Sequence, residues 1–243
     1  PAFFGRVPNR KELEERLAAT LGEADGYEDI LDRARIFGQE QAFLIGVRVL
    51  AGSLDAGRAG NAFADLADVL VAALLAAARN EFETLHGKIA KGQVAVIAMG
   101  KLGGREMTAA SDLDLIVLYD FDEKKLESNG ERPLAGAQYF MRLTQRLLAA
   151  LSAPTAEGTL YEVDFRLRPS GKSGPLATHI DAFVAYQAKD AWTWEHMALT
   201  RARVIAGDKA FRRRVATSIK NILLQPREPD RLLADVASMR ERL

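Results

Sequence analysis

The chain has 243 residues, of which 48% are hydrophobic and 27% charged, a balance that excludes disorder and collagen-like structure and fits one large domain or two small ones. Its 33 basic and 33 acidic side chains cancel, so no global field favours nucleic acid or an anionic membrane, and charges interrupt the apolar runs too often for a transmembrane segment. Zero cysteine excludes disulfides, iron–sulfur clusters and thiol catalysis, and fits the reducing cytoplasm.

Helical periodicity dominates the first part of the sequence. Asn9 and Glu12 resemble a capping box, and the helix that they start is expected to end at Gly22. Apolar stripes predict two longer helices at about 27–50 and 61–86. Both are rich in alanine, which allows close approach, so we expect an antiparallel pair. Residues 1–90 are therefore predicted to form a helical arm.

The periodicity changes after Gly92. Short apolar runs rich in β-branched residues predict buried strands at 94–99, 113–119 and 159–167, with a helix around Phe140 to Leu151 between the last two. The fold class expected is α+β, with a small mixed sheet flanked by helices over residues 91–207.

Helices return after Gly174, at about 180–187, 191–205 and 209–223, and residues 208–243 are expected to begin a C-terminal helical region. The chain starts at Pro1 without an initiator methionine or a signal-peptide pattern, and it stops at Leu243 within a helical periodicity. These ends indicate a piece of a longer protein.

Three acidic residues on two predicted strands are the strongest functional signal. Asp112 and Asp114 lie two positions apart at the start of a strand, so their side chains point to the same face. Carboxylates this close repel each other unless a cation lies between them, which is typical of a hard-metal site. Asp164, on the later strand, is a candidate third ligand, and two Mg²⁺ ions bridged by carboxylates are a common device for displacement at phosphorus.

A glycine pair after the first strand adds a second signal. Gly103 and Gly104 allow the backbone to approach phosphate oxygens, and Lys101 or Arg105 can add positive charge. Alone this signal is weak, because glycine pairs after strands are mostly tight turns and the spacing matches neither a P-loop nor a dinucleotide fingerprint.

Two arginines near Asp164 leave alternatives open. Arg166 and Arg168 are expected on the same strand face as Asp164, where either can bind phosphate or pair with the acids. Phosphate is favoured for Arg166, and the two interpretations are balanced for Arg168.

Other polar residues have ordinary structural interpretations. Trp194, Glu195 and His196 near a helix start are expected to pack or pair, and the run 212–214 of three arginines is expected on a solvated face. Arg201 and Arg203 are expected on different faces of the helix 191–205, one of them within reach of the active cleft.

These motifs resemble those of the polymerase-β-like nucleotidyltransferases, and more closely those of the glutamine synthetase adenylyltransferases. That bifunctional family adds AMP to glutamine synthetase and removes it. The resemblance covers about residues 94–207 and is carried by GKLGGRE at 100–106, SDLD at 111–114, YEVDFRLRPSG at 161–171 and WEH at 194–196.

The resemblance implies a polymerase-β-like nucleotidyltransferase fold and a role for each matching residue. Asp112, Asp114 and Asp164 match the catalytic acids that hold two Mg²⁺ ions. ATP would be bound by a second set of residues, namely Lys101, Gly103, Gly104, Ser111, Arg166 and Arg168. The implied partners are glutamine synthetase as protein substrate and, through the full-length protein, a PII-type signal protein, with no nucleic acid and no membrane.

The expected activity is transfer of AMP from ATP to a tyrosine of glutamine synthetase with release of pyrophosphate, which regulates nitrogen assimilation. Similarity over residues 186–204 to the C-terminal half of the family favours addition of AMP. Asp164 is best placed to assist deprotonation of the tyrosine. The alternatives are the phosphate-dependent removal of AMP and a catalytically silent module that binds nucleotide or protein.

Overall fold

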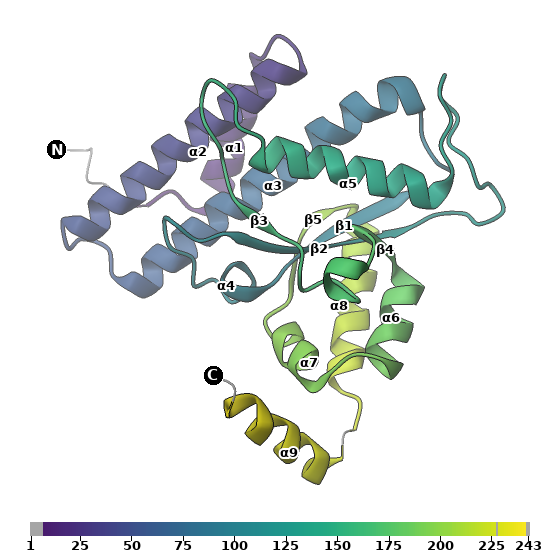
Figure 1. Ribbon diagram of the computed structural model, residues 1–243. Coiled ribbons are helices and arrows are strands. Elements are labelled where there is room, and N and C mark those ends of the chain that lie inside the picture. The colour runs from purple at the N-terminus through teal and green to yellow at the C-terminus, as the bar shows by residue number, and fades with distance from the viewer. Residues whose placement is uncertain (1–6, 227, 242–243) are drawn as a thin grey trace.

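The computed structural model describes residues 7–226 and 228–241, so Pro1 and Leu243 lie outside the described residues. Helices cover both faces of a small sheet (Figure 1). One face is covered by α1 (Arg10–Gly22), α2 (Tyr27–Leu50), α3 (Ala56–His86) and α5 (Gly136–Ser152). The other is covered by α6 (Ile180–Lys189), α7 (Thr193–Leu199) and α8 (Lys209–Leu223), and α9 (Pro229–Arg240) lies against α7. The α+β class is confirmed.

The sheet is mixed and has five described strands, β1 (Gln93–Ala98), β2 (Leu113–Asp120), β3 (Val163–Asp164), β4 (Ala177–His179) and β5 (Arg203–Gly207). The order is β3-β2-β1-β5. β1 is antiparallel to β2 and β5, whereas β2 is parallel to β3 at its start and to β4 near its end. A short helix, α4 (Gly100–Gly103), follows β1, and a 3₁₀ turn, η2 (Gly171–Ser173), precedes β4.

The alternation of side chains along the strands creates two cores. Leu113, Leu115 and Val117 of β2 pack with the α1, α2, α3 and α5 side, whereas Ile116 and Leu118 pack with the α6 and α8 side. Asp114 lies two residues before Ile116, so its side chain points to the same face of the sheet as Ile116 and Leu118. Its carboxylate therefore belongs to the face covered by α6 and α8, beyond the end of that core.

The helical first part of the chain agrees closely with its sequence pattern. The Asn9 side chain accepts from the Glu12 amide, and the Glu12 carboxylate accepts from the Asn9 amide. These reciprocal hydrogen bonds confirm the capping box. α2 has the expected bounds and packs antiparallel to α3 (Figure 1). α3 begins five residues earlier than expected, because Asp55 accepts from the Arg58 amide and caps the helix there.

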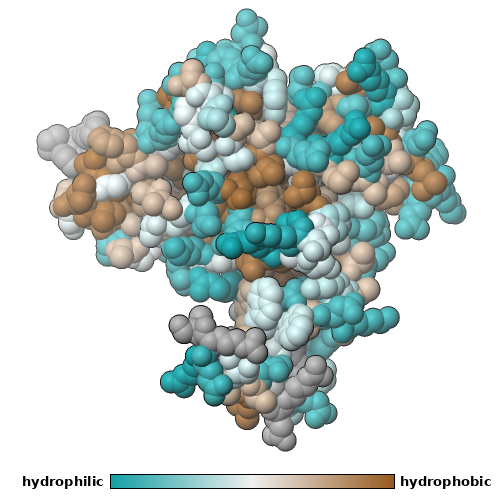
Figure 2. All heavy atoms as spheres, in the orientation of Figure 1, coloured by the Kyte–Doolittle hydropathy of each residue, from teal (hydrophilic) through white to brown (hydrophobic). Residues whose placement is uncertain are grey.

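α3 is the central core helix. By length and composition it is apolar enough to cross a membrane, against the sequence expectation, with a mean hydropathy of 1.7 over its best window. In the fold 61% of that window is buried, which is typical of a core helix in a globular protein. The exposed apolar atoms in Figure 2 lie at the C-terminal end of α2, which carries the exposed side chains of Phe43 and Leu50.

Two predictions of secondary structure after residue 158 are wrong. The helix expected over 191–205 ends at Leu199, and Arg203 lies on strand β5, whose short apolar run pairs with β1. The strand expected over 159–167 contains only Val163 and Asp164, because the Asp164 carboxylate accepts from the Arg166 amide and turns the chain. The expected division of the chain at residues 90 and 207 stays a prediction.

α2 holds the segment that leads into β3. Arg35 has no exposed surface, and its guanidinium donates to four backbone carbonyls, at 2.8 Å to Ala153 and at 2.9–3.1 Å to Leu31, Ala150 and Gly158. The carbonyls of Ala150 and Ala153 are at the C-terminal end of α5, where a cation is favourable. One buried cation therefore joins α2, the end of α5 and the turn before β3.

Replacing Arg35 with methionine removes these donors and leaves buried carbonyls without partners. We expect Arg35→Met to lower the free energy of unfolding by about 3 kcal/mol or more, measured by urea denaturation. Arg33→Met on the same helix is the matched control. It removes partly exposed ion pairs with Asp29 and Glu23 and is expected to lower stability much less than Arg35→Met does. Equal losses in the two variants would contradict the structural role of Arg35.

Candidate active site

Three carboxylates meet where β2 and β3 begin to pair. Asp114 lies directly opposite Asp164 in the parallel register, and the Leu113 amide donates to the Glu162 carbonyl at 2.9 Å. Asp112 precedes β2 by one residue. Carboxylate oxygens of Asp112, Asp114 and Asp164 all lie within 4.8 Å of one another, and each residue is partly exposed. The structure thus brings together the three acids that the sequence analysis selected.

The electrostatics of the three acids differ. Burial raises the pKa of Asp114, and the neighbouring charges of Asp112 and Asp164 raise it further. Hydrogen bonds from Arg166 hold the pKa of Asp164 below its usual value. Like charges at this spacing are costly in a fold without a compensating cation, and carboxylate oxygens are the ligands that Mg²⁺ prefers. The donor set therefore fits a divalent metal ion.

Gly100 makes room for the Asp114 carboxylate. Its φ is +51°, and a Cβ atom at this position would lie 2.0 Å from Oδ2 of Asp114. A side chain at residue 100 would therefore displace the carboxylate as well as strain the backbone. In the sequence, Gly100 stands within the motif at 100–106, with no role of its own predicted for it. The signal available was a glycine that directly follows a buried strand and precedes the acids on its neighbour.

The other residues of the α4 loop occupy different positions around the carboxylates. Lys101 is exposed, and its charge acts on Asp114. The amides of Gly103 and Gly104 donate within the loop, to the carbonyls of Met99 at 2.7 Å and Gly100 at 3.1 Å. Gly103 also packs against the Arg201 backbone, where a Cβ would lie 2.2 Å from the carbonyl oxygen. Both glycines thus serve close packing in this structure.

Ser111 is buried and shapes the turn before the acids. Its hydroxyl accepts from the Thr108 amide at 3.0 Å and lies 2.9 Å from the Thr108 hydroxyl. This turn leads directly to Asp112.

Arg166 and Arg168 do not share a strand face, because the chain turns after Asp164. Arg166 pairs with the Asp164 carboxylate through Nε at 2.6 Å and Nη2 at 2.5 Å. Its guanidinium remains largely exposed, which leaves Nη1 for another acceptor. Arg168 forms no ion pair with the three acids, and phosphate binding by Arg168 stays a prediction. It donates to the carbonyls of Phe165, Lys172 and Gly174 at 2.7–3.1 Å and so closes the loop around η2.

Two arginines that were expected on a helix hold the α4 loop instead. Arg201 donates to the Gly100 carbonyl at 3.0 Å and pairs with Glu106. Arg203, on β5, donates to the Leu102 carbonyl at 3.0 Å and pairs with Asp68, a fully buried residue of α3. Burial raises the pKa of Asp68, while the paired arginine opposes this shift. The helical arm and the loop are thereby connected through one buried carboxylate.

Glu195 and His196 have structural partners, as the sequence analysis expected. Glu195 accepts from the Trp192 amide at 2.8 Å and from the Tyr186 hydroxyl at 2.9 Å. His196 Nε2 lies 2.8 Å from the Gln187 carbonyl. None of these three contacts involves Asp112, Asp114 or Asp164.

A small mixed sheet with three acids at the start of two neighbouring strands is consistent with a nucleotidyltransferase-like fold. The comparisons with known proteins agree with this class. The family profile of glutamate-ammonia ligase adenylyltransferases matches residues 2–218, and the chain belongs to this family.

Curated relatives cover almost the whole chain. The bifunctional glutamine synthetase adenylyltransferase/adenylyl-removing enzyme of Brucella suis biovar 1 is 59% identical over 241 residues, which is 99% of this chain and 24% of that protein. The proteins of the same name from Bradyrhizobium sp. (strain BTAi1) and Mesorhizobium japonicum are each 55% identical over 240 residues, again 99% of this chain and 24% of theirs. The chain thus spans about a quarter of the length of these relatives.

The close approach of Gly100 and Asp114 can be tested by adding one methyl group. We expect Gly100→Ala to lower the free energy of unfolding by about 1 kcal/mol, because φ is positive, and to weaken Mn²⁺ binding measured by titration. Gly46→Ala in α2 is the control, since a Cβ there meets nothing within 4 Å. It should raise stability by about 0.5–1 kcal/mol. Unchanged Mn²⁺ affinity in Gly100→Ala would contradict the role of Gly100.

The raised pKa of Asp114 predicts a stability change that depends on pH. The ionised carboxylate costs stability as the pH rises through the raised pKa, so Asp114→Asn should be more stable than the unchanged chain in metal-free buffer at pH 7. The gain should shrink as the pH falls through the raised pKa and vanish below about pH 3, where the carboxyl is protonated in both the folded and the unfolded state. Added Mg²⁺ should stabilise the unchanged chain and not the variant.

Thermal unfolding across pH measures this difference, and Asp122→Asn is the matched control. Hydrogen bonds from the Lys124 amide and Lys91 lower the pKa of Asp122, so its replacement should bring no gain. A less stable Asp114→Asn variant in metal-free buffer would show that the three acids do not repel one another.

Proposed function

We propose that this chain transfers AMP from ATP to a tyrosine of glutamine synthetase. The observation that carries the proposal is the convergence of Asp112, Asp114 and Asp164 within 4.8 Å in a member of this family. In the reaction the tyrosine oxygen attacks the α-phosphorus, the bond to the β-phosphate oxygen breaks, and pyrophosphate leaves while the tyrosine loses its proton. Regulation of nitrogen assimilation and association with a PII-type protein through a longer chain belong to the same proposal.

The three acids would hold two Mg²⁺ ions, which supply charge neutralisation for the triphosphate and stabilise the attacking and leaving oxygens. Lys101 is exposed beside the acids and adds positive charge for the phosphates. Nη1 of Arg166 is available for a phosphate oxygen. Arg168, Gly103, Gly104 and Ser111 have a supporting role in this proposal, because they shape the nucleotide site. Arg168 binds backbone carbonyls, the two glycines bond within their loop, and Ser111 contacts Thr108.

The role that we propose for Asp164 leaves out the assistance to tyrosine deprotonation that was expected from the sequence. The hydrogen-bonded ion pair with Arg166 lowers the pKa of Asp164, which makes its carboxylate a weak proton acceptor. We therefore propose Asp164 as a metal ligand and not as the general base.

The reverse direction is the second candidate, because the relatives are named as both adenylyltransferase and adenylyl-removing enzymes. In that reaction a phosphate oxygen attacks the phosphorus of the AMP–tyrosine, ADP forms and the tyrosine is released. The same acids would serve both directions. A silent binding module is disfavoured because all three acids are present and converge.

The decisive experiment offers the chain ATP labelled at the α-phosphate, Mg²⁺ and unmodified glutamine synthetase. We expect labelled protein and an equal amount of pyrophosphate, and a loss of about a hundredfold or more in Asp112→Asn, because the variant loses a ligand and a charge. Asp122→Asn should keep normal activity. Faster ADP release from the AMP-modified protein and phosphate would reverse the assigned direction, and full activity in Asp112→Asn would exclude the metal site.

A further inference from the structure

The guanidinium of Arg201 lies on the glycine loop beside the three acids. Arg201 follows α7 and precedes β5 by two residues. Its Nε donates to the Gly100 carbonyl at 3.0 Å, and its Nη2 donates to the Glu106 carboxylate at 2.5 Å. A Cβ atom at Gly104 would lie 2.3 Å from Nη2 and 2.7 Å from Cζ, so the guanidinium packs directly against that glycine. These contacts hold the cation in place, although 40% of the side chain is exposed.

Gly100 connects this cation to the carboxylate at the centre of the site. The carbonyl of Gly100 accepts the hydrogen bond from Arg201. A Cβ atom on the same residue would lie 2.0 Å from Oδ2 of Asp114. Arg201 and Asp114 therefore contact neighbouring atoms of one residue, and Arg201 lies at the border of the candidate metal site.

The strand order places two arginines on opposite flanks of Asp114. β2, which carries Asp114, lies between β3 and β1. Arg166 pairs with Asp164 on the β3 side, whereas Arg201 binds the loop that follows β1. A nucleotide held through the three acids would thus meet a guanidinium on each flank.

Arg201 keeps hydrogen-bond donors for an anionic ligand. A guanidinium has five N–H donors, and the contacts of Arg201 with the described residues use only Nε and Nη2. Its ion-pair partner Glu106 has a side chain that is 65% exposed, and an ion pair so exposed contributes little stability. A phosphate can therefore bind at Nη1 and replace Glu106 at Nη2.

The glycine loop has other anchors, so holding it in place does not require Arg201. Arg203 donates to the Leu102 carbonyl at 3.0 Å and pairs with the buried Asp68. Arg105 pairs with Asp65 of α3 at 2.8 Å. Both anchoring arginines are less exposed than Arg201. This difference favours a ligand-binding role for Arg201.

We propose that Arg201 binds the β- and γ-phosphates of ATP, the part of the substrate that leaves as pyrophosphate. This inference rests on the proposed function, in which the α-phosphorus lies at the metal ions held by the three acids. Arg201 is one residue further out and is placed for the phosphates beyond it. A guanidinium forms paired, charge-assisted hydrogen bonds with phosphate, and here it would compensate the charge that develops on the leaving group.

The test is isothermal titration calorimetry with an ATP analogue that has a methylene group between the α- and β-phosphorus, because this analogue binds without reacting. We expect Arg201→Met to weaken binding of the analogue in Mg²⁺ by about tenfold or more, through loss of hydrogen bonds from a charged donor to phosphate. AMP lacks the β- and γ-phosphates, so its affinity should stay unchanged. The affinity for Mn²⁺ without nucleotide should also stay unchanged.

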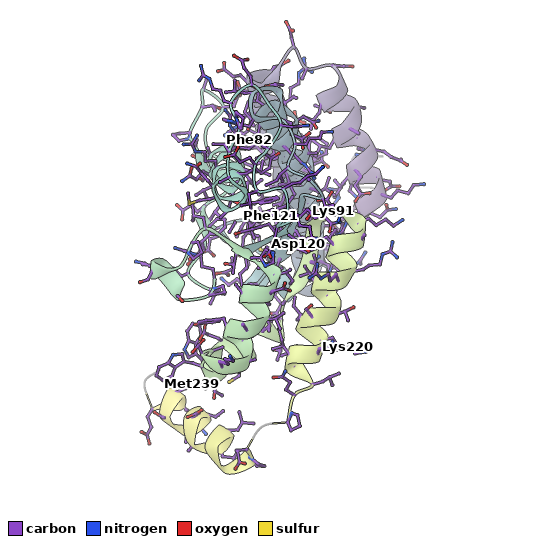
Figure 3. All side chains as sticks on the ribbon, turned by 90° about the vertical axis from the view of Figure 1, so that its right-hand side faces the viewer. Phe82, Lys91, Asp120, Phe121, Lys220 and Met239 are labelled. Carbon is purple, nitrogen blue, oxygen red and sulfur yellow. The ribbon has the colours of Figure 1, made fainter. Side chains whose placement is uncertain are left out.

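Arg214→Met is the matched control. Arg214 is also partly exposed and paired with an acid, but its partner Asp120, labelled in Figure 3, is the last residue of β2, at the opposite end of the strand from Asp114. Its replacement should leave the affinity for the analogue unchanged. Unchanged affinity in Arg201→Met, an equal loss for AMP, or a parallel loss of Mn²⁺ affinity would overturn the proposal.

A second variant leaves Arg201 in place. Glu106→Gln removes the carboxylate that competes with phosphate for Nη2, so binding of the analogue should become about threefold tighter. Glu131→Gln is the control, an exposed acid near the C-terminal end of α3, and should leave the affinity unchanged. Unchanged or weaker binding in Glu106→Gln would contradict the role of Arg201.

These measurements separate the inference from the proposed function. Binding is measured without glutamine synthetase and without AMP transfer. If the unchanged chain binds the analogue and Arg201→Met binds it equally well, this inference alone fails. If the unchanged chain does not bind the analogue, the inference and the proposed function fail together.

Discussion

The pairing of β2 with β3 is the interaction on which the site depends. Only two residues of each strand take part, and this short parallel ladder places Asp164 directly opposite Asp114. A shift of one residue would turn Asp164 to the other face of the sheet. So short a ladder cannot specify its register alone. The neighbouring contacts from α2 therefore matter for the chemistry as well as for stability.

α2 supplies those contacts from one side of the helix. Arg35 holds the end of α5 and the Gly158 carbonyl, Gln39 donates to the Glu157 carbonyl at 2.7 Å, and Asp32 accepts from the Thr155 hydroxyl at 2.7 Å. Together they fix the turn that enters β3. On the other side of the site, Arg203 and the buried Asp68 join α3 to the α4 loop. The helical arm thus positions both the third carboxylate and the loop beside it.

The charges of the site explain why these supports are needed. Three acids within 4.8 Å oppose their own assembly, and burial adds to the cost at Asp114. Arg166 compensates Asp164, and Lys101 acts on Asp114 from an exposed position. The remaining repulsion is the property that makes the site suitable for divalent cations. A rigid scaffold with its own buried ion pairs keeps the carboxylates together before any cation arrives.

The sequence by itself determined the long helices, the two main strands and the three acids, because each has a local signal. Amphipathic periodicity indicates α2, a short apolar run with β-branched residues indicates β2, and spacing places Asp112 and Asp114 on one face. Only the tertiary structure decided that residues 203–207 form an edge strand, that β3 has two residues, and that Arg166 and Arg168 have different partners. Those outcomes depend on contacts between distant segments. Residues 203–207 form a strand because they pair with β1. Arg203 pairs with Asp68, which lies 135 positions away in the sequence, so no local pattern predicts this contact.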